Sequence, residues 1–319
     1  MRCSPSRVWA LMLAAALCLV SIQAWAQFES STNDSPAARD AAAPLVGQLK
    51  GALARIHARG SVAIGHRAAS IPFSYLSPRG EPIGYSIDIC RAIVDRISTL
   101  LDKELKIEWV PVTSDNRLDA IESGQVDLEC GSTTANAERM KRVAFSPTIF
   151  VSGTRLLVGA GSGIRGYRDL GGRTVVVTRG TTNEAAVRDV LKKAAIDATI
   201  TIAPDHEESY QLLASGKADA MATDDVLLYG LLALHDSRDR YRIVGDLLSY
   251  DPYGIGYPAR DPDMKAVVGD AVQALAASRE LEWLYGKWFL RQLPSGQRLN
   301  MPMSPQLVEM FRLMGGEIR

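Results

Sequence analysis

Strand-like and helix-like stretches alternate along most of this 319-residue chain, and the series begins twice. In the first series, short apolar strands and helices with one apolar side are expected at residues 61–66, 87–101, 107–111, 116–123 and 126–131. An apolar run at 148–158 precedes a second series at 173–177, 182–194, 199–202, 205–215, 218–223 and 224–234. A late strand at 253–257 and helices at 262–278 and 281–290 follow. Such alternation predicts an α/β fold with two lobes, each a parallel-rich sheet flanked by helices.

Polar and charged residues follow the predicted strands, at the ends where open α/β sheets bind ligands. Among them are Arg67, Ser114, Arg117, Ser132, Thr134, Arg139, Thr182, His206 and Asp224. The arginines suit two carboxylates, because a guanidinium group binds a carboxylate through two parallel hydrogen bonds. The aspartate suits an ammonium group. Because buried charges must be paired, this set favours a small acidic amino acid as the ligand.

The segment Thr181-x-x-Glu184 has the spacing of a capping box at the start of a helix. Free backbone amides at such a helix start attract anions, so Thr181 and Thr182 are candidates to meet a carboxylate. Helix caps of this kind also occur in α/β domains where no ligand binds. The coincidence of polar residues at several strand ends therefore carries more weight than this motif.

The N-terminus has the pattern of a secretory signal peptide. Arg2 and Arg7 precede an uncharged run at 8–20, and Ala24-Trp25-Ala26 matches a cleavage site. The alternative, a membrane anchor, needs about 20 apolar residues. We therefore expect residues 1–26 to be a signal peptide, 27–49 a flexible leader rich in Ser, Asp, Ala and Pro, and the mature protein to be exported in soluble form.

Cleavage would remove two of the four cysteines and leave Cys90 and Cys130. An oxidising compartment permits a disulfide between them, and the alternative is that both are small buried apolar residues. The histidines have no metal-ligand spacing, so neither a metal nor a cofactor is expected. A formal net charge of zero disfavours a nucleic-acid partner.

Several motifs together resemble family 3 periplasmic solute-binding proteins of ABC transporters, in particular the glutamate/aspartate-binding branch. The resemblance covers roughly residues 50–303. Its most specific elements are Thr113-Ser114-x-Asn116-Arg117 and Gly131-Ser132-Thr133-Thr134 followed by Glu138-Arg139. Further matches are Gly65-His66-Arg67, Pro72-Phe73-Ser74-Tyr75, Gly180-Thr181-Thr182, Asp205-His206, Asp224-Asp225 and Leu299-Asn300-Met301.

The resemblance implies a type II periplasmic-binding-protein fold with a two-strand hinge near residues 151–157 and 253–257. Lobe 1 would be discontinuous, at 50–153 plus 252–300, with lobe 2 at 154–251 and a C-terminal tail at 301–319. It also implies roles for the site residues. Arg139 would hold the α-carboxylate, with Ser132, Thr134 and Thr182 nearby, and Asp224 the α-ammonium group. The side-chain carboxylate would be surrounded by Arg67, Ser114, Arg117 and His206, and Phe73 or Tyr75 would pack on the aliphatic part.

The function implied is a monomeric, non-enzymatic receptor that delivers L-glutamate or L-aspartate, or both, to a membrane permease. These two ligands differ by one methylene group, and the residues do not rank them. Two other functions stay open, namely an amino-acid sensor for a signalling partner and a dehydratase-like enzyme on the same scaffold. The chain has no nucleophile motif and no added catalytic domain to favour the enzyme.

Overall fold

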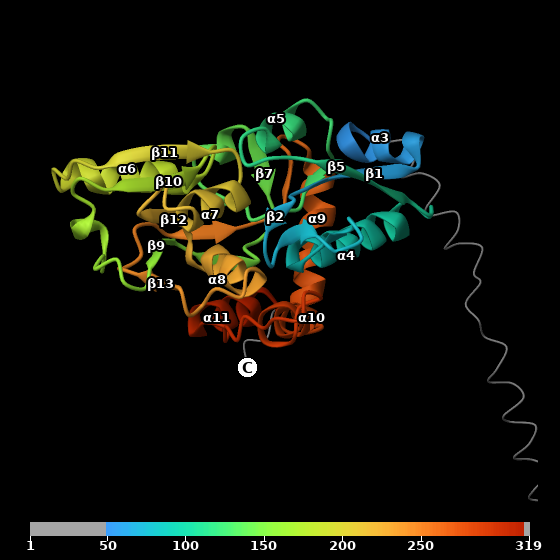
Figure 1. Cartoon of the computed structure of the whole chain (residues 1–319). Helices are drawn as coiled ribbons and strands as arrows, with labels where there is room; N and C mark the ends of the chain where they lie inside the picture. The colour runs from blue at the N-terminus through green and yellow to red at the C-terminus, as the bar shows by residue number, and fades with distance from the viewer. Residues whose placement is uncertain (1–48, 316–319) are drawn as a thin grey trace, which may run out of the picture. The chain divides into compact units, whose positions relative to one another are not determined.

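The structure, a computed structural model, describes residues 49–315. The predicted signal peptide and residues 27–48 of the predicted leader lie outside the described residues. The described residues contain two five-stranded sheets, and we call each sheet with its helices a lobe (Figure 1). The residue limits predicted for the lobes stay predictions.

Lobe 1 is built on a sheet with the strand order β5-β1-β6-β15-β7. Its strands are β1 (Ser61–His66), β5 (Lys106–Pro111), β6 (Leu128–Glu129), β7 (Val143–Phe145) and β15 (Gly256–Pro258). β1 pairs in parallel with β5 and β6, whereas β15 is antiparallel to its neighbours. A small antiparallel sheet, β2 (Ala69–Ser70), β3 (Ser74–Leu76) and β4 (Pro82–Ile83), follows β1.

The helices of lobe 1 come from both ends of the described chain. They are α3 (Gly51–Arg59), α4 (Tyr85–Leu100), α5 (Arg117–Glu122), α9 (Pro262–Ala277), α10 (Glu280–Tyr285) and α11 (Pro305–Met314). Residues of α3, α4, α9, α10 and α11 share one core, and Figure 1 shows α9 beside α4. The predicted helix 281–290 ends earlier as α10 and continues as a π-helical turn at Gly286–Leu290.

Lobe 2 repeats the arrangement with the strand order β11-β10-β12-β9-β13. Its strands are β9 (Thr154–Gly159), β10 (Thr174–Thr178), β11 (Thr199–Ala203), β12 (Ala220–Asp224) and β13 (Tyr241–Val244). Side chains of β10 alternate between two cores, since Val175 and Val177 pack on one side and Val176 on the other. The first core includes α6 (Thr182–Lys193), and the second includes α7 (His206–Ala214) and α8 (Asp225–Leu234). Helices therefore cover both faces, as the alternation of elements predicts.

Two short antiparallel strands, β8 (Phe150–Ser152) and β14 (Asp251–Tyr253), form the hinge. Each hinge strand expected from the sequence is divided, because β8 is followed by β9 of lobe 2 and β14 by β15 of lobe 1. Glycines stand at both divisions. A Cβ atom at Gly153 would lie 2.3 Å from the carbonyl oxygen of Ser249, and one at Gly254 would lie 3.2 Å from that of Ser146. The close backbone approach explains why a glycine stands at each division.

The residues predicted as a C-terminal tail include α11, for which the sequence analysis expected no element. Ser304 caps this helix by accepting a hydrogen bond from the backbone amide of Leu307, and Pro305 occupies its first turn. Leu307 and Phe311, one turn apart, are buried in the core of lobe 1. The Ser-Pro pair and the apolar spacing were the signals for this helix in the sequence.

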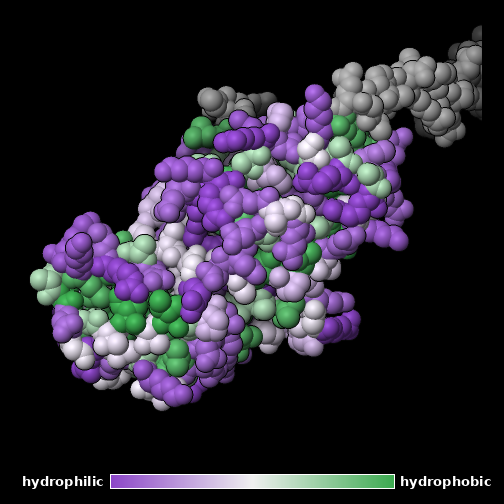
Figure 2. All heavy atoms as spheres, turned by 90° about the horizontal axis from the view of Figure 1, so that it is seen from above, coloured by the Kyte–Doolittle hydropathy of each residue, from purple (hydrophilic) through white to green (hydrophobic). Residues whose placement is uncertain are grey.

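None of the helices in residues 49–315 combines the length and the apolar character that crossing a bilayer requires. The face of the protein seen in Figure 2 carries mainly hydrophilic residues, interrupted by smaller hydrophobic groups.

Candidate ligand-binding site

A small pocket lies between the two lobes, at the carboxyl ends of their strands. All nine residues chosen from the sequence line it: Arg67, Ser114, Arg117, Ser132, Thr134 and Arg139 from lobe 1, and Thr182, His206 and Asp224 from lobe 2. Thr181, Asn183 and Leu227 complete the lining. Parallel strands bring these residues together because their carboxyl ends share one edge of each sheet.

Three buried arginines dominate the lobe 1 side of the pocket. Arg67, Arg117 and Arg139 are 3%, 2% and 8% exposed. Burial lowers the pKa of each guanidinium group, and for Arg117 the charges of the other two lower the pKa further. The Nε atom of Arg117 has no hydrogen-bond partner within residues 49–315. Such a concentration of buried positive charge is costly alone and is matched by an anionic ligand.

The arginines are oriented by backbone and hydroxyl oxygens of both lobes. Arg67 donates to the hydroxyl of Ser114, and Arg117 donates to the Ser114 carbonyl oxygen. Across the cleft, Arg117 and Arg139 both donate to the carbonyl oxygen of Gly180, at 3.4 and 3.2 Å. One carbonyl at the end of β10 thus connects the arginines of lobe 1 to lobe 2.

Asp224 places a carboxylate on the lobe 2 side of the pocket, at the end of β12. Its two oxygens accept hydrogen bonds from the amide of Asn183, at 2.8 Å, and from the hydroxyl of Tyr253. Burial and the nearby charge of Asp251 raise the pKa of Asp224 to about 7, although these two hydrogen bonds oppose the shift. A cation bound beside Asp224 would favour its ionised form.

His206 is buried at the start of α7, with Nδ1 2.9 Å from the hydroxyl oxygen of Thr178. Burial, followed by the charges of Arg67 and Arg117, lowers the pKa of His206 to about 3. The imidazole is therefore neutral near pH 7. It contributes a hydrogen-bonding group to the pocket and adds no positive charge to the arginines.

The capping box predicted at the start of α6 is wrong. Thr181 occupies the N-cap position, but its hydroxyl donates to the carbonyl oxygen of Thr178 at 2.7 Å, and no side chain caps the helix. Glu184 instead pairs with Arg188 one turn along the helix. Thr181 and Thr182 nevertheless both line the pocket.

The two aromatic residues expected to pack on the ligand do not line the pocket. Phe73 is fully buried in an aromatic cluster with Tyr85, Phe150, Tyr253 and Phe289. Tyr75 packs edge-on against Trp288. Leu227 of α8 is the apolar residue of the lining.

Two acidic residues near the pocket were not chosen from the sequence, Glu129 and Asp251. Glu129 ends β6, is fully buried, and neither of its carboxylate oxygens has a hydrogen-bond partner among residues 49–315. Its negative charge raises the pKa of all three site arginines. Asp251 begins β14 and contacts both lobes through the hydroxyls of Thr134 and Thr182. Glu129 stands two positions before the motif Gly131-Ser132-Thr133-Thr134, whereas no local pattern distinguishes Asp251.

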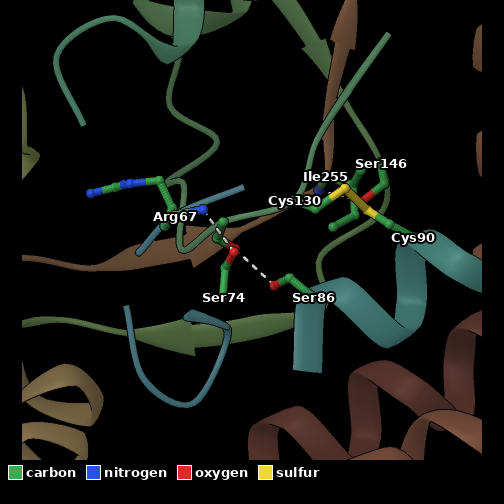
Figure 3. The surroundings of a disulfide bond; sticks show 8 residues. Arg67, Ser74, Ser86, Cys90, Cys130, Ser146 and Ile255 are labelled. Atoms are coloured by element: carbon green, nitrogen blue, oxygen red, sulfur yellow. Dashed lines mark hydrogen bonds between the residues drawn. A yellow bond between two sulfur atoms is a disulfide. The ribbon is translucent and has the colours of Figure 1, made fainter. Parts of the chain in front are cut away.

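A disulfide joins Cys90 of α4 to Cys130, which directly follows β6, with their Cα atoms 6.3 Å apart (Figure 3). Of the two alternatives that the sequence left open, the structure therefore has the covalent bond. Nearby, the hydroxyl of Ser86 donates to the Gly131 carbonyl oxygen, and the Arg67 amide donates to Ser74. These bonds tie the start of α4 and the strand β3 to the segments that carry Arg67 and Ser132.

No cluster of three or more histidine, cysteine, aspartate or glutamate side chains able to hold a metal ion occurs in the part of the chain that the structure describes.

Residues 62–291 match the family described as bacterial extracellular solute-binding proteins, family 3. The L-glutamate/L-aspartate-binding protein of Pseudomonas aeruginosa is 41% identical over 273 residues, which cover 84% of this chain and 90% of that protein. The glutamate/aspartate import solute-binding protein of Escherichia coli is 38% identical over 275 residues, covering 86% and 90%. Among solved structures, a mutant of ArgBP from T. maritima is similar with a TM-score of 0.67 and 25% identity, covering 75% of this chain and 99% of that one. This fold is that of the type II periplasmic amino-acid-binding proteins, as the sequence predicted, and the chain belongs to the bacterial extracellular solute-binding proteins of family 3.

Proposed function

We propose that this protein is the substrate-binding component of an ABC importer and binds L-glutamate or L-aspartate, or both, between its lobes. The observation that carries the proposal is the pocket lined by three buried arginines and one buried aspartate. The relatives reported above, which are named for glutamate and aspartate, support the same ligand class.

The charges of the lining match those of an acidic amino acid group by group. Arg139 is assigned to the α-carboxylate, and Arg67 and Arg117 to the side-chain carboxylate together with Ser114 and neutral His206. Asp224 is assigned to the α-ammonium group. A glutamine ligand would leave the charge of one arginine pair without a carboxylate, and an unpaired buried charge is costly. Discrimination between acid and amide is expected from this difference.

Binding is expected to proceed by closure of the two lobes about the β8–β14 hinge. The ligand would first meet one lobe and then engage the other when the cleft closes. A ligand shifts this equilibrium only by its differential affinity for the closed state, which contacts from both lobes provide. The closed lobes together would then present the surface that a membrane permease recognises.

We further propose that the protein acts as an exported, monomeric receptor in the periplasm and makes or breaks no bond in its ligand. The relatives reported above are named as binding proteins, which supports this assignment over the dehydratase-like alternative. Recovery of unchanged L-glutamate after prolonged incubation, followed by NMR, tests it. Conversion of the ligand to a keto acid or another product would favour the enzyme.

The first test is a thermal-shift screen of the mature protein, unfolded and refolded to remove carried-over ligand, against the twenty amino acids. A ligand present at about 100 times its Kd stabilises the folded state by about 2.7 kcal/mol. L-Glutamate or L-aspartate should give the largest shift, and L-glutamine little. Stabilisation by neutral or basic amino acids alone would contradict the ligand assignment.

The second test is Arg139→Ala, measured by calorimetry. Truncating one partner of a buried charge pair costs roughly 2–5 kcal/mol, so L-glutamate should bind at least about 30-fold more weakly. Arg142→Ala is the matched control, because Arg142 is exposed and pairs with Asp119 and Glu122 at the surface. Equal affinity of the two variants would refute the role of Arg139.

A further inference from the structure

The chain that connects the π-helical turn to α11 belongs to lobe 1 but contacts lobe 2. It lies beyond residues 62–291, which match the family. It is fixed to lobe 1, because Leu299 is 3% exposed in the lobe 1 core and the backbone amide of Met301 donates to the Phe289 carbonyl oxygen at 3.1 Å. α11 then packs against α9. The carbonyl groups of Arg298 and Leu299 therefore have a defined place on lobe 1.

Arg238 of lobe 2 makes the contact with this segment. It follows α8, and its guanidinium group donates to the carbonyl oxygen of Arg298 and, at 3.3 Å, to that of Leu299. The loop that carries Arg238 is held to lobe 2, because Ser237 is fully buried and its backbone amide donates to the Leu232 carbonyl oxygen at 3.1 Å. One side chain thus joins a fixed segment of each lobe.

The helix α8 connects the Arg238 contact to the pocket. It begins at the pocket, which Leu227 lines, and its ten residues span about 15 Å. One face of α8 packs on lobe 1 along this length. Leu227 and Ala233 belong to the lobe 1 core, and a Cβ atom at Gly230 would lie 2.3 Å from the Ile71 carbonyl oxygen. A movement of lobe 2 against lobe 1 therefore has to displace α8, and the Arg238 loop moves with it.

The Arg238 contact exists together with hydrogen bonds across the pocket. Arg117 and Arg139 of lobe 1 both donate to the Gly180 carbonyl oxygen of lobe 2 in the same structure. Opening of the cleft about the β8–β14 hinge would separate these groups. It would also break the bonds of Arg238, because a hydrogen bond is lost when donor and acceptor are more than about 3.5 Å apart.

We propose that Arg238 is a positioning residue that holds lobe 2 to the C-terminal segment of lobe 1 and so keeps the cleft closed over the ligand. A contact made only in the closed state lowers the free energy of closure and thereby raises the apparent affinity, without touching the ligand. It also slows release, because the cleft has to open before the ligand can leave. This inference rests on the proposed function, in which closure accompanies binding.

The test is Arg238→Ala, with L-glutamate as the ligand. Loss of the two hydrogen bonds should raise Kd by about threefold to tenfold in calorimetry. Release of radiolabelled L-glutamate into an excess of unlabelled ligand should become faster by a similar factor. Arg238→Lys keeps the charge and one donor group, so it should recover part of the affinity. An unchanged Kd and release rate in Arg238→Ala would overturn the inference.

Urea unfolding without ligand separates closure from a merely structural role. The bonds of Arg238 are absent from the open state in this proposal, so the ligand-free variant should unfold at the same urea concentration as the wild type. A residue that only supports the fold would behave in the opposite way. A lower unfolding midpoint with an unchanged Kd would therefore also overturn the inference.

Arg240→Ala is the matched control. Arg240 is an exposed arginine of the same loop, and its guanidinium carbon lies 5.9 Å from the ring centre of Tyr241 in lobe 2. This variant should match the wild type in Kd and in release rate. Equal weakening by both variants would assign the effect to the positive charge of the loop and overturn the inference. The proposed function fails separately, if the wild-type protein binds neither L-glutamate nor L-aspartate.

Discussion

At the scale of single residues, Asp224 connects ligand binding to pH. Its pKa of about 7 follows from burial and from the charge of Asp251. The folded-state pKa lies above the unfolded value of 3.8. The free energy of unfolding of the ligand-free protein should therefore fall as the pH rises from about 3.8 toward 7, because Asp224 must ionise in a buried position. An ammonium group bound to the carboxylate would offset that cost.

The affinity for L-glutamate should therefore depend on pH between about 5.5 and 8. Below pH 7 Asp224 is largely protonated and must release a proton to bind the ammonium group. Kd should therefore rise as the pH falls, by at most about tenfold per pH unit. His206, with its pKa of about 3, does not titrate in this range. Calorimetry across the pH series measures the slope, and Asp224→Asn should abolish it. A wild-type Kd that stays constant would contradict the prediction.

Glu129 offsets part of the positive charge of the three site arginines. The three guanidinium groups repel one another, and the charge of Glu129 raises the pKa of each. Its carboxylate is buried and has no hydrogen-bond partner among residues 49–315, so its contribution is long-range charge compensation.

Glu129→Gln should lower the stability of the ligand-free protein by about 3 kcal/mol, the order found when one partner of a buried ionic group is removed. L-Glutamate should then give a larger increase in Tm than in the wild type, because the ligand carboxylates replace the missing charge. Glu122→Gln, which breaks only a surface pair with Arg142, should cost less than about 1 kcal/mol. Urea unfolding with and without ligand measures both. Equal stabilities would argue against charge compensation.

At the scale of elements, the disulfide joins the helix α4 to the end of β6, from which the segment with Ser132 and Thr134 begins. It closes a loop between positions 40 residues apart. A covalent link of this kind mainly restricts the unfolded chain, and the hydrogen bond from Ser86 to Gly131 supports the same junction in the folded state.

Replacing both cysteines, as Cys90→Ala with Cys130→Ala, should lower the free energy of unfolding by about 2–4 kcal/mol. Ligand affinity should change little, because neither cysteine lines the pocket. Urea unfolding and calorimetry separate the two effects. An unchanged unfolding midpoint, or a large loss of affinity with stability intact, would assign the disulfide a different role.

At the scale of the whole molecule, the backbones of the two lobes approach each other closely at Gly180. Gly180 of lobe 2 has a φ angle of 71°, and a Cβ atom there would lie 2.6 Å from both the Asp115 Cα atom and the Ser114 carbonyl oxygen of lobe 1. Its own carbonyl accepts hydrogen bonds from Arg117 and Arg139. A glycine is required both for the φ angle and for the close approach.

Gly180→Ala should therefore weaken L-glutamate binding by about tenfold or more, or about 1.4 kcal/mol, because the added methyl group keeps the lobes apart. Gly172→Ala is a matched control, since Gly172 has a φ angle of 68° and no atom within 4 Å of the added Cβ. Both variants bear a similar backbone strain, but only the first should lose affinity in calorimetry. Similar affinities would indicate that the lobes close without this contact.

The class of fold and most of the pocket could be predicted from local patterns in the sequence. Periodicity specified the alternating elements, and the carboxyl ends of parallel strands converge in any such sheet, so Arg67, Arg117 and Asp224 could be brought together before their positions were known. The short strands β8 and β14, by contrast, are separated from their neighbours by glycines whose close backbone contacts no local pattern reveals.

Local patterns could not predict the pairing of the cysteines, the aromatic packing of Phe73 or the surroundings of Glu129 and Asp251. Each depends on residues far apart in the chain, as when Asp251 meets Thr134 at a separation of 117 positions. Local propensity constrains the shape of a segment but not which distant side chain will share its hydrogen bond. That choice follows from how the two lobes pack around the hinge, and so from the free energy of the whole fold.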